Sequence, residues 1–321
     1  MTIDFLKNKK ICVTGGAGLL GMALTKKFLA AGIDVESSYF SRLPLPDLAH
    51  CFKQYDFNRF DDCIAATRGK DVVIICAVQA AGVKGIQQSP TATLLPNLAI
   101  HAGLFEACTI NRVEKAVWVS SSTVYQEAFY PIREDQLDLN LPVYDLYAGI
   151  GWVYRYLEQM AACYYRKRGL NIGVIRTSNI YGPYDRFDEQ KSHVIPALIK
   201  RALAGESPYM VWGNGSTVRD FVYVDDLVEG VLRVLKGYCI ADPINISNGS
   251  PVTIGELVTT ILDVCNHQTP ILFDHDKPTA VPYRVLDNTK CHTLLGEFPR
   301  TALKSGLQVT VDWYNSAQRR D

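Results

Sequence analysis

The chain has 321 residues, enough for one large α/β domain or for a main domain with a smaller lobe. Its 33 lysines and arginines balance 33 aspartates and glutamates, so no net charge attracts nucleic acid or a membrane, and an anionic ligand needs local cations. The nine cysteines show no C-x-x-C pair or zinc spacing, and no apolar run reaches the ~20 residues of a membrane span. Because the N-terminus is too polar for a secretion signal, we expect a cytoplasmic protein with reduced thiols and no bound metal.

A glycine-rich loop follows a short apolar run near the N-terminus. Residues 11–13 are predicted to form a strand, and an amphipathic helix is expected to continue to Leu29. In this context Gly15 allows a tight turn, Gly18 lets the backbone approach a pyrophosphate, and Gly21 lets the helix pack against the sheet. The sequence therefore predicts a dinucleotide site that begins with Gly15, Gly18, Leu19, Leu20 and Gly21.

The second strand, expected within residues 32–40, bears on the choice of cofactor. NAD sites usually end this strand in an acidic residue that holds the adenosine ribose. Tyr39 stands near that place and Arg42 follows, so the pattern leans towards NADP, although a solvated loop arginine explains Arg42 equally well. After a third strand at residues 51–57, Asp56 and Phe57 are expected to meet the adenine, with a helix cap as the alternative for Asp56.

Buried strands and helices then alternate along the chain. Residues 71–77 and 116–119 are predicted to be buried strands, with a long helix at 93–111 between them. This alternation indicates a doubly wound parallel sheet, whose ligands bind at the carboxyl ends of its strands. Ala77 and Asn97 are therefore expected at the cofactor.

Hydroxyl groups cluster directly after the strand that ends at Val119. Ser121 and Thr123 are well placed to hydrogen-bond a substrate carbonyl, and a turn or helix cap explains them as well. Tyr147 is expected in the first turn of a helix that runs to about Lys167, close to this cluster. A sixth strand is predicted at residues 171–176.

The glycine loop, residues 121–125, Tyr147 and residues 176–183 together resemble the extended short-chain dehydrogenase/reductase superfamily over nearly the whole chain. Residues 191–201 and 211–226 are similar to the GDP-L-fucose synthases, which act on GDP-4-keto-6-deoxy sugars with NADPH. The resemblance implies a Rossmann sheet of about seven strands, NADP or NAD as cofactor, a GDP-linked sugar as substrate and a homodimer.

Carried over position by position, the resemblance also implies roles for single residues. Ser121 would hydrogen-bond the C4 oxygen, Tyr147 would donate a proton, and His193 would be an acid for C3/C5 epimerisation, with a helix-start histidine as the alternative. Ile180 would contact the cofactor. The substrate would contact Asn179, Val194, Lys200, Arg201, Trp212, Arg219 and Arg284.

Two positions depart from the family pattern. Gly151 replaces the lysine of Tyr-x-x-x-Lys, which in the family holds the nicotinamide ribose and lowers the tyrosine pKa. A neutral tyrosine is already a proton donor, whereas its activation as a base from a pKa near 10 needs about 4 kcal/mol at pH 7, so reduction should suffer less than oxidation. Arg155, one turn further along, is expected to be too distant to replace the lysine. Thr123 stands where the fucose synthases carry an acidic cysteine, which puts double epimerisation in question.

These observations predict a dinucleotide-binding domain of residues 1–178 and 223–250 and a smaller nucleotide-sugar lobe of residues 179–222 and 251–321. The preferred activity is NAD(P)-dependent C4 reduction of a GDP-linked 4-keto-6-deoxyhexose or heptose. The alternatives are a 4-epimerase or C4 oxidase with tightly bound NAD, and a degenerate protein that binds both ligands without turnover.

Overall fold

The computed structural model describes residues 3–80, 83–188, 192–277, 280–297 and 300–318. Its centre is a seven-stranded sheet of order β11-β6-β5-β4-β1-β2-β3, in which every pairing is parallel. The strands are β1 (Ile11–Thr14), β2 (Val35–Tyr39), β3 (Phe52–Gln54), β4 (Val72–Ile75), β5 (Lys115–Ser121), β6 (Ile172–Thr177) and β11 (Ile244–Ile246). The predicted Rossmann sheet is thus confirmed, and the order reverses between β1 and β4, where such sheets bind ligands.

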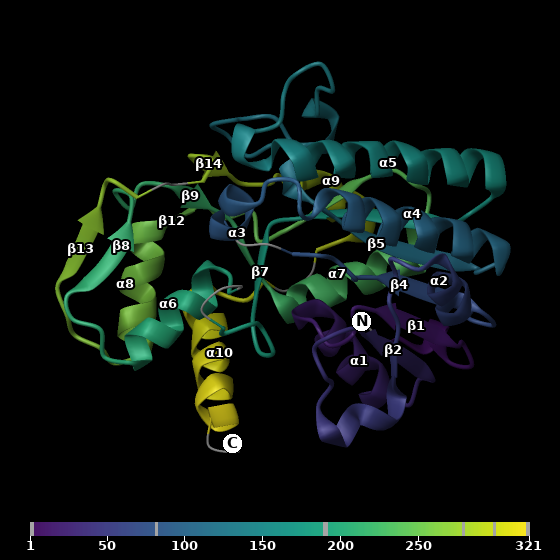
Figure 1. Cartoon of the computed structure of the whole chain (residues 1–321), viewed down its shortest axis with the longest axis horizontal. Coiled ribbons are helices and arrows are strands. Elements are labelled where there is room, and N and C mark those ends of the chain that lie inside the picture. Colours follow the sequence, from purple (N-terminus) through teal and green to yellow (C-terminus); the bar gives the residue numbers. More distant parts are fainter. Residues whose placement is uncertain (1–2, 81–82, 189–191, 278–279, 298–299, 319–321) are drawn as a thin grey trace.

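Helices cover both faces of this sheet (Figure 1). They are α1 (Leu19–Ala30), α2 (Phe60–Thr67), α4 (Leu94–Ile110), α5 (Ala148–Arg168) and α7 (Val224–Gly237). α1 contacts α7 on one face, whereas α2, α4 and α5 pack in succession on the other. The core is split accordingly: Leu24 and Phe28 belong to one apolar cluster, and Leu104 and Phe105 to the other. Burial on both faces explains why β4 is apolar at every position. Among the described residues, none of the helices has the length and apolar character needed to cross a membrane.

Smaller sheets lie beside the central one. β7 (Asn179–Tyr181) pairs with β10 (Phe221–Tyr223), β8 (Tyr209–Trp212) pairs with β13 (Ile271–Asp274), and β9 (Val218–Arg219) lies between β12 (Val252–Thr253) and β14 (Tyr283–Arg284). α8 (Ile254–Val264) contacts both α6 (Val194–Leu203) and α10 (Leu303–Gln318), and this group stands beside the central sheet in Figure 1. The remaining helices are α3 (Val83–Gln88) and α9 (Thr289–Leu295). α9 packs on α7 and β11, and the division of the chain into two lobes at residues 178, 223 and 250 stays a prediction.

The predicted elements agree with the structure in type but differ in their ends. The strand expected at residues 51–57 is β3 alone, because this edge strand pairs only with β2 and only over three residues. Tyr147 lies in a short 3-10 helix (Asp145–Tyr147) and is the N-cap of α5, one residue before the helix begins. Lys191, within one of the segments that resemble the fucose synthases, lies outside the described residues.

A buried aromatic cluster joins α4, β5 and α5. The indole N–H of Trp118 donates to Nδ1 of His101 over 3.2 Å, and the Tyr154 hydroxyl lies 3.4 Å from Nε2. Because Nδ1 accepts, the proton of the neutral ring is on Nε2 and is directed at Tyr154. Burial lowers the pKa of His101 to about 3.

The neutral His101 predicts a specific sensitivity to acid. Between the ordinary pKa of 6.5 and the folded pKa of about 3, the unfolded chain binds the extra proton, so stability is lost as the pH falls below 6.5. The free energy of unfolding of the wild type, minus that of His101→Gln, should decrease by up to about 1.4 kcal/mol for each unit by which the pH falls in this range. Urea unfolding at several pH values measures this difference, in which the other titrating groups cancel. A difference that does not change with pH would contradict a neutral buried His101.

Candidate active site at the carboxyl ends of the strands

The loop between β1 and α1 forms a cradle that a side chain would fill. Gly15 has a φ of +68°, and a Cβ at this position would lie 2.8 Å from the backbone of Ala77. A Cβ on Gly21 would overlap the carbonyl oxygen of Gly15. Gly18 is the N-cap of α1, so the N–H groups at the start of this helix, at Leu19 and Leu20, are natural donors to a pyrophosphate.

The end of β2 carries no carboxylate, as the sequence predicts. The Ser38 hydroxyl accepts the N–H of Gly15 over 2.8 Å and braces the glycine loop. The Nη1 atom of Arg42 is buried without a hydrogen-bond partner among the described residues. Burial and the nearby charge of Arg186 lower the pKa of Arg42, while Asp185 acts in the opposite direction. A phosphate group at this position would accept a hydrogen bond from the unpartnered N–H and would reduce the repulsion between the two like charges.

Asp56 and Phe57, expected at the adenine, lie in the turn between β3 and α2. Oδ1 of Asp56 accepts the backbone N–H and the side-chain amide of Asn58 over 3.1 and 2.8 Å. Its side chain does not cap α2, whose N-cap is Arg59. The ring of Phe57 is buried and stacks on Tyr55 with 5.9 Å between centroids. The contact of these residues with adenine stays a prediction.

Asn97 on α4 is fully buried and holds the segment that follows β4. Its Oδ1 accepts the N–H of Gln79 over 2.9 Å, and its Nδ2 donates to the Gln79 carbonyl over 3.1 Å. Asn97 therefore positions the backbone near Ala77, at the strand end expected to lie under the cofactor. Ile180, the last predicted cofactor residue, lies in β7 opposite Val222.

The Ser121 hydroxyl at the end of β5 is oriented by the next turn. Its oxygen accepts the backbone N–H of Thr123 over 3.1 Å and the Thr123 hydroxyl over 3.0 Å. Because the oxygen accepts twice, the Ser121 proton is left to be donated to another group. Ser121 thus both caps the 3-10 helix Ser122–Val124 and offers a directed donor.

A buried arginine of α5 fixes this loop. Arg155 donates from Nε to the Val124 carbonyl over 2.7 Å and from Nη1 to the Leu141 carbonyl over 2.6 Å. Its guanidinium also stacks on Trp152, 4.5 Å from the ring centroid. Arg155 is therefore a positioning residue for the loop, although its Nη2 atom is buried without a hydrogen-bond partner among the described residues. The expectation that it does not replace the missing lysine stays a prediction.

Position 151, where the family pattern has a lysine, has no room for a side chain. A Cβ on Gly151 would lie 2.6 Å from the carbonyl oxygen of Thr123 and 2.9 Å from Cγ1 of Val143. Both contacts are shorter than real Cβ atoms make. The loss of the lysine is therefore matched by the packing of the Thr123 turn against the first turn of α5.

Tyr147 is partly buried, and the charges of two arginines act on it. Burial raises the pKa of its hydroxyl, and the charges of Arg219 and Arg284 act in the opposite direction. The hydroxyl is therefore protonated at pH 7, the form that a proton donor requires. Arg219 and Arg284 face each other in the β9–β14 pair and are only 8% and 5% exposed.

Neither arginine forms an ion pair with a carboxylate of the described residues. Arg284 donates from Nη1 to the Gln126 carbonyl over 3.0 Å and from Nη2 to the Tyr125 carbonyl over 3.3 Å. Arg219 donates from Nη1 to the carbonyl of its neighbour Val218 over 2.7 Å. Two buried cations that form no ion pair within the described part of the chain favour an anionic ligand.

A buried ion pair that the sequence analysis missed lies behind these groups. Glu158 of α5 contacts Arg176 of β6 over 2.7 Å and accepts the Ser120 hydroxyl over 2.8 Å. Arg176 donates to the Tyr125 hydroxyl over 2.9 Å, which donates in turn to Asn245 over 2.7 Å. The sequence contained one sign of this ion pair: Glu158 is an acidic residue among the apolar positions of the predicted helix.

His193 is the N-cap of α6 and lies beside a buried carboxylate. Its Nδ1 is 3.3 Å from Oδ1 of Asp185, and this contact raises the pKa of His193. Oδ2 of Asp185 is buried without a hydrogen-bond partner among the described residues. The raised pKa favours the protonated form of this half-exposed imidazole, and a protonated imidazole can donate a proton.

The other predicted substrate residues differ in how free their side chains are. The guanidinium of Arg201 is used by Glu206 and lies 4.7 Å from the ring centroid of Tyr209. Asn179 donates to the carbonyl of Asp220 over 3.1 Å, and Trp212 is exposed at the end of β8. Substrate contact stays a prediction for Asn179, Val194, Lys200, Arg201 and Trp212.

The residues at the strand ends fit a dinucleotide. The hydroxyl oxygens of Thr177, the last residue of β6, and of Ser178, which follows it, are buried without hydrogen-bond partners among the described residues, as is Nη1 of Arg42. These atoms and the glycine cradle lie at the carboxyl ends of β1, β2 and β6. Polar atoms of this kind are satisfied when a ligand binds.

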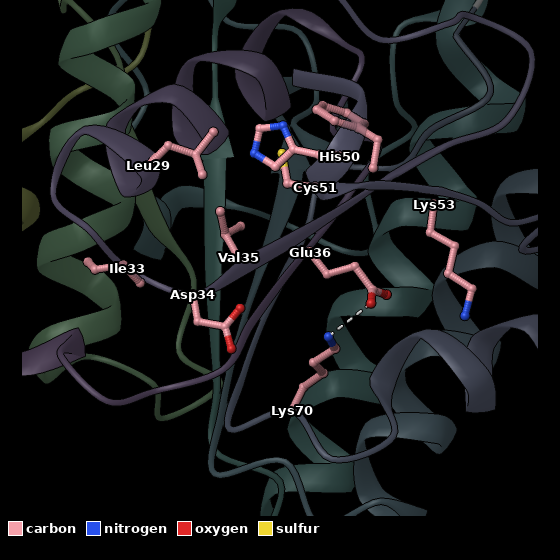
Figure 2. A pocket seen from close by; sticks show the side chains of 10 residues that line it. Leu29, Ile33, Asp34, Val35, Glu36, His50, Cys51, Lys53 and Lys70 are labelled. Atoms are coloured by element: carbon pink, nitrogen blue, oxygen red, sulfur yellow. Dashed lines mark ion pairs between the residues drawn. The ribbon is translucent and has the colours of Figure 1, made fainter. Parts of the chain in front are cut away.

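A hollow of about 450 Å³ elsewhere on the sheet does not belong to this site. It is lined by residues that precede or begin β2, β3 and β4, among them Asp34, Phe52 and Lys70, so it lies at the amino ends of the strands. Figure 2 shows Lys70 and Glu36 pointing toward each other there, with 3.2 Å between their charged atoms.

The parallel sheet and the glycine cradle are typical of a dinucleotide-binding enzyme of the short-chain dehydrogenase type. The chain belongs to the NAD dependent epimerase/dehydratase family, whose model matches residues 11–246. The predicted superfamily and its NAD(P) cofactor are thereby confirmed.

Individual relatives extend over nearly the whole chain. It is 29% identical over 326 residues to "Probable GDP-L-fucose synthase 1" of Oryza sativa subsp. japonica, with 97% of this chain and 94% of that protein covered. A UDP-glucose 4-epimerase from Thermotoga maritima has the same fold, with a TM-score of 0.85, 23% identity and coverage of 96% and 99%. So does a GDP-6-OMe-4-keto-L-xylo-heptose reductase from C. jejuni, with a TM-score of 0.85, 21% identity and coverage of 99% of each chain.

The contact at position 151 predicts the effect of adding one methyl group. Gly151→Ala should destabilise the protein by about 1–3 kcal/mol and lower turnover, because its Cβ displaces the Thr123 carbonyl and hence Ser121. Gly237→Ala is the matched control, since Gly237 ends α7 and a Cβ there meets nothing within 4 Å. Urea unfolding of both variants measures the difference. Equal stabilities would contradict the close approach of Thr123 to α5.

Proposed function

We propose that the protein is an NAD(P)-dependent reductase that converts the C4 ketone of a GDP-linked 4-keto-6-deoxyhexose or heptose to an alcohol. One observation carries the proposal: Arg219 and Arg284, whose charges act on the protonated hydroxyl of Tyr147, are buried and form no ion pair with a carboxylate of the described residues. A protonated hydroxyl can donate a proton to the oxygen of a ketone that is being reduced, and the two arginines can bind the diphosphate of a nucleotide sugar. The similarity to a probable GDP-L-fucose synthase over 97% of the chain supports a GDP-linked substrate.

In this proposal each side chain has one chemical task. The bound nicotinamide supplies a hydride to C4 of the sugar. Tyr147 donates its proton to the C4 oxygen, and Ser121 donates a hydrogen bond to the same oxygen through the proton that Thr123 leaves available. Arg219, which uses only Nη1 within the described structure, binds the diphosphate together with Arg284 and fixes the sugar in register.

We propose reduction without double epimerisation. The contact with Asp185 supports His193 as one acid. Thr123 stands at the position of the second, but its hydroxyl is a weak acid and donates its proton to Ser121.

A 4-epimerase or C4 oxidase with tightly bound NAD is the second candidate, because a UDP-glucose 4-epimerase shares the fold over 96% of the chain. Such an enzyme needs Tyr147 to accept a proton, and burial opposes this by raising the tyrosine pKa. Cofactor that remains bound through purification would favour this candidate. Binding of both ligands without turnover would favour a degenerate protein.

A homodimer and a cytoplasmic location remain proposals. The outward faces of α4 and α5 carry the exposed apolar side chains of Leu95, Trp152 and Tyr156, which support a contact between two copies of this helix pair.

The reductase activity is tested by the absorbance of reduced nicotinamide. Incubation with GDP-4-keto-6-deoxymannose and NADPH or NADH should consume the cofactor, and NMR should show an alcohol at C4. Tyr147→Phe should lower kcat by about 10²–10⁴-fold, because it removes the proton donor. Tyr130→Phe, a change at a half-exposed tyrosine, is the control. If the wild type binds both ligands and consumes no cofactor, the reductase proposal is wrong.

The cofactor preference is tested with fragments of the dinucleotide. If Arg42 binds the 2′-phosphate of NADP, Arg42→Gln should weaken binding of 2′,5′-ADP by about tenfold or more and leave 5′-AMP unchanged, since one charge-assisted hydrogen bond is worth about 1.5–3 kcal/mol. Calorimetric titration measures both affinities. Equal effects on the two fragments would instead indicate that Arg42 only maintains the loop.

A further inference from the structure

The side chain of Asp220 lies where several segments of the chain meet. Asp220 is the single residue between β9 and β10, and it is completely buried. Its Oδ1 atom accepts the backbone N–H groups of Asn248 and Gly249 over 3.2 Å each. Its Oδ2 atom accepts those of Gly249 and Leu286 over 3.2 and 3.3 Å. Because its backbone carbonyl also accepts the N–H of Asn179 over 3.2 Å, Asp220 joins β7, the loop after β11 and the segment after β14.

Two of the segments that meet at this carboxylate carry the buried arginines. Arg219 directly precedes Asp220, and Arg284 lies two residues before Leu286, whose N–H binds the carboxylate. The two arginines are paired neighbours in β9 and β14, strands that lie together with β12 in Figure 1. Since each of the two strands is only two residues long, their ladder is short. The carboxylate therefore adds a bridge between them just beyond its end.

Only an ionised carboxyl group can accept all of these hydrogen bonds. A proton on Oδ2 would stand among N–H donors from two segments, and so would a proton on Oδ1, so either one weakens the bridge. An asparagine has the same defect, because its amide group replaces one acceptor with donors. Burial raises the pKa of Asp220 to about 6, although the hydrogen bonds act in the opposite direction. Mild acid is therefore sufficient to protonate it.

Other titratable and charged groups lie on the segments around Asp220. Burial raises the pKa of Tyr283 in β14, and Asp220 acts in the same direction. Asp287 lies on the segment that follows β14. Arg300, which is hydrogen-bonded to His292, donates to a carbonyl of the loop after β11 over 3.1 Å. A test of Asp220 has to separate its protonation from changes at these groups.

We propose that Asp220, while it is ionised, is the positioning residue that holds Arg219 and Arg284 in the arrangement that binds a diphosphate. The inference rests on the proposed function for the identity of the ligand, a nucleotide sugar. Acid weakens the bridge between β9, β14 and the loop after β11, so the affinity for the ligand falls. The general gain of positive charge at low pH has the opposite effect, because it strengthens the binding of an anion.

The binding part is tested by calorimetric titration with GDP-mannose at pH 7 and pH 5. The diphosphate of this probe is esterified at both ends and does not titrate in this range. If only the ionised protein binds, the Kd of the wild type should rise about tenfold between pH 7 and pH 5. Asp220→Asn should bind about tenfold more weakly at pH 7 and change little at pH 5. Asp61→Asn, exposed on α2, is the matched control and should behave as the wild type.

Two results of this titration would overturn the inference. One is a wild-type Kd that stays constant or falls when the pH is lowered. The other is an Asp220→Asn variant that binds GDP-mannose as tightly as the wild type at pH 7.

Kinetics separate a positioning role from a mere loss of folded protein. Asp220→Asn should raise KM by about tenfold and leave kcat within about threefold, because the arginines bind the diphosphate whereas Tyr147 donates the proton. A lower kcat with an unchanged KM would contradict the proposed role, since that pattern indicates fewer active molecules and not weaker binding.

A measurement without ligand distinguishes this inference from the proposed function. The Nε–H resonances of Arg219 and Arg284, assigned by replacing each arginine with glutamine, are followed by NMR between pH 7 and pH 5. In the wild type they should shift with a common midpoint near pH 6, and in Asp220→Asn they should not. If the wild type does not bind GDP-mannose but shows these shifts, the GDP-linked substrate is wrong and the role of Asp220 stands. Wild-type resonances that do not shift would overturn the inference.

The test does not depend on the folding of the variant. If circular dichroism shows that Asp220→Asn does not fold, the pH series of the wild type decides, because both its Kd and its arginine resonances should then change with the same midpoint. Different midpoints for the two would overturn the inference.

Discussion

The arrangement of the site depends on the buried ion pair between Glu158 and Arg176. It connects the middle of α5 to β6, and through the Ser120 and Tyr125 hydroxyls it reaches the end of β5 and the loop beyond it. Removing one member of such a pair leaves an unpaired buried charge, at a cost of about 3–5 kcal/mol. The pair therefore fixes the register of α5 against the sheet, and with it the position of Tyr147 relative to Ser121.

Close approach of one backbone to another is the second constraint on the site. At Gly15 and Gly21 the chain folds onto itself to form a cradle, and at Gly151 the Thr123 turn comes so near α5 that no side chain fits. The first two glycines leave space in the loop where the sequence predicts a pyrophosphate. The third leaves no space at the position where the resemblance predicts a lysine, one turn after Tyr147.

Because the protein has no net charge, its buried arginines are the local cations that an anion would require. With 33 positive and 33 negative side chains, the protein has no global field to hold an anion, yet Arg219 and Arg284 are buried without a carboxylate partner among the described residues. Buried cations are costly unless a ligand or a catalytic anion balances them.

The sequence by itself determined the fold class, the glycine cradle and the order in which polar residues follow the ends of the strands. These features could be predicted because apolar runs and glycine spacing are local patterns with a direct physical meaning. It also identified Ser121, Tyr147 and the absence of a lysine at position 151. Only the tertiary structure decided that this position has no room for a side chain, that Thr123 orients Ser121, that Glu158 pairs with Arg176, and that Arg284 donates to the carbonyls of Tyr125 and Gln126. These relations join residues up to 159 positions apart, and no local pattern encodes which buried charge meets which partner once strands and loops have packed.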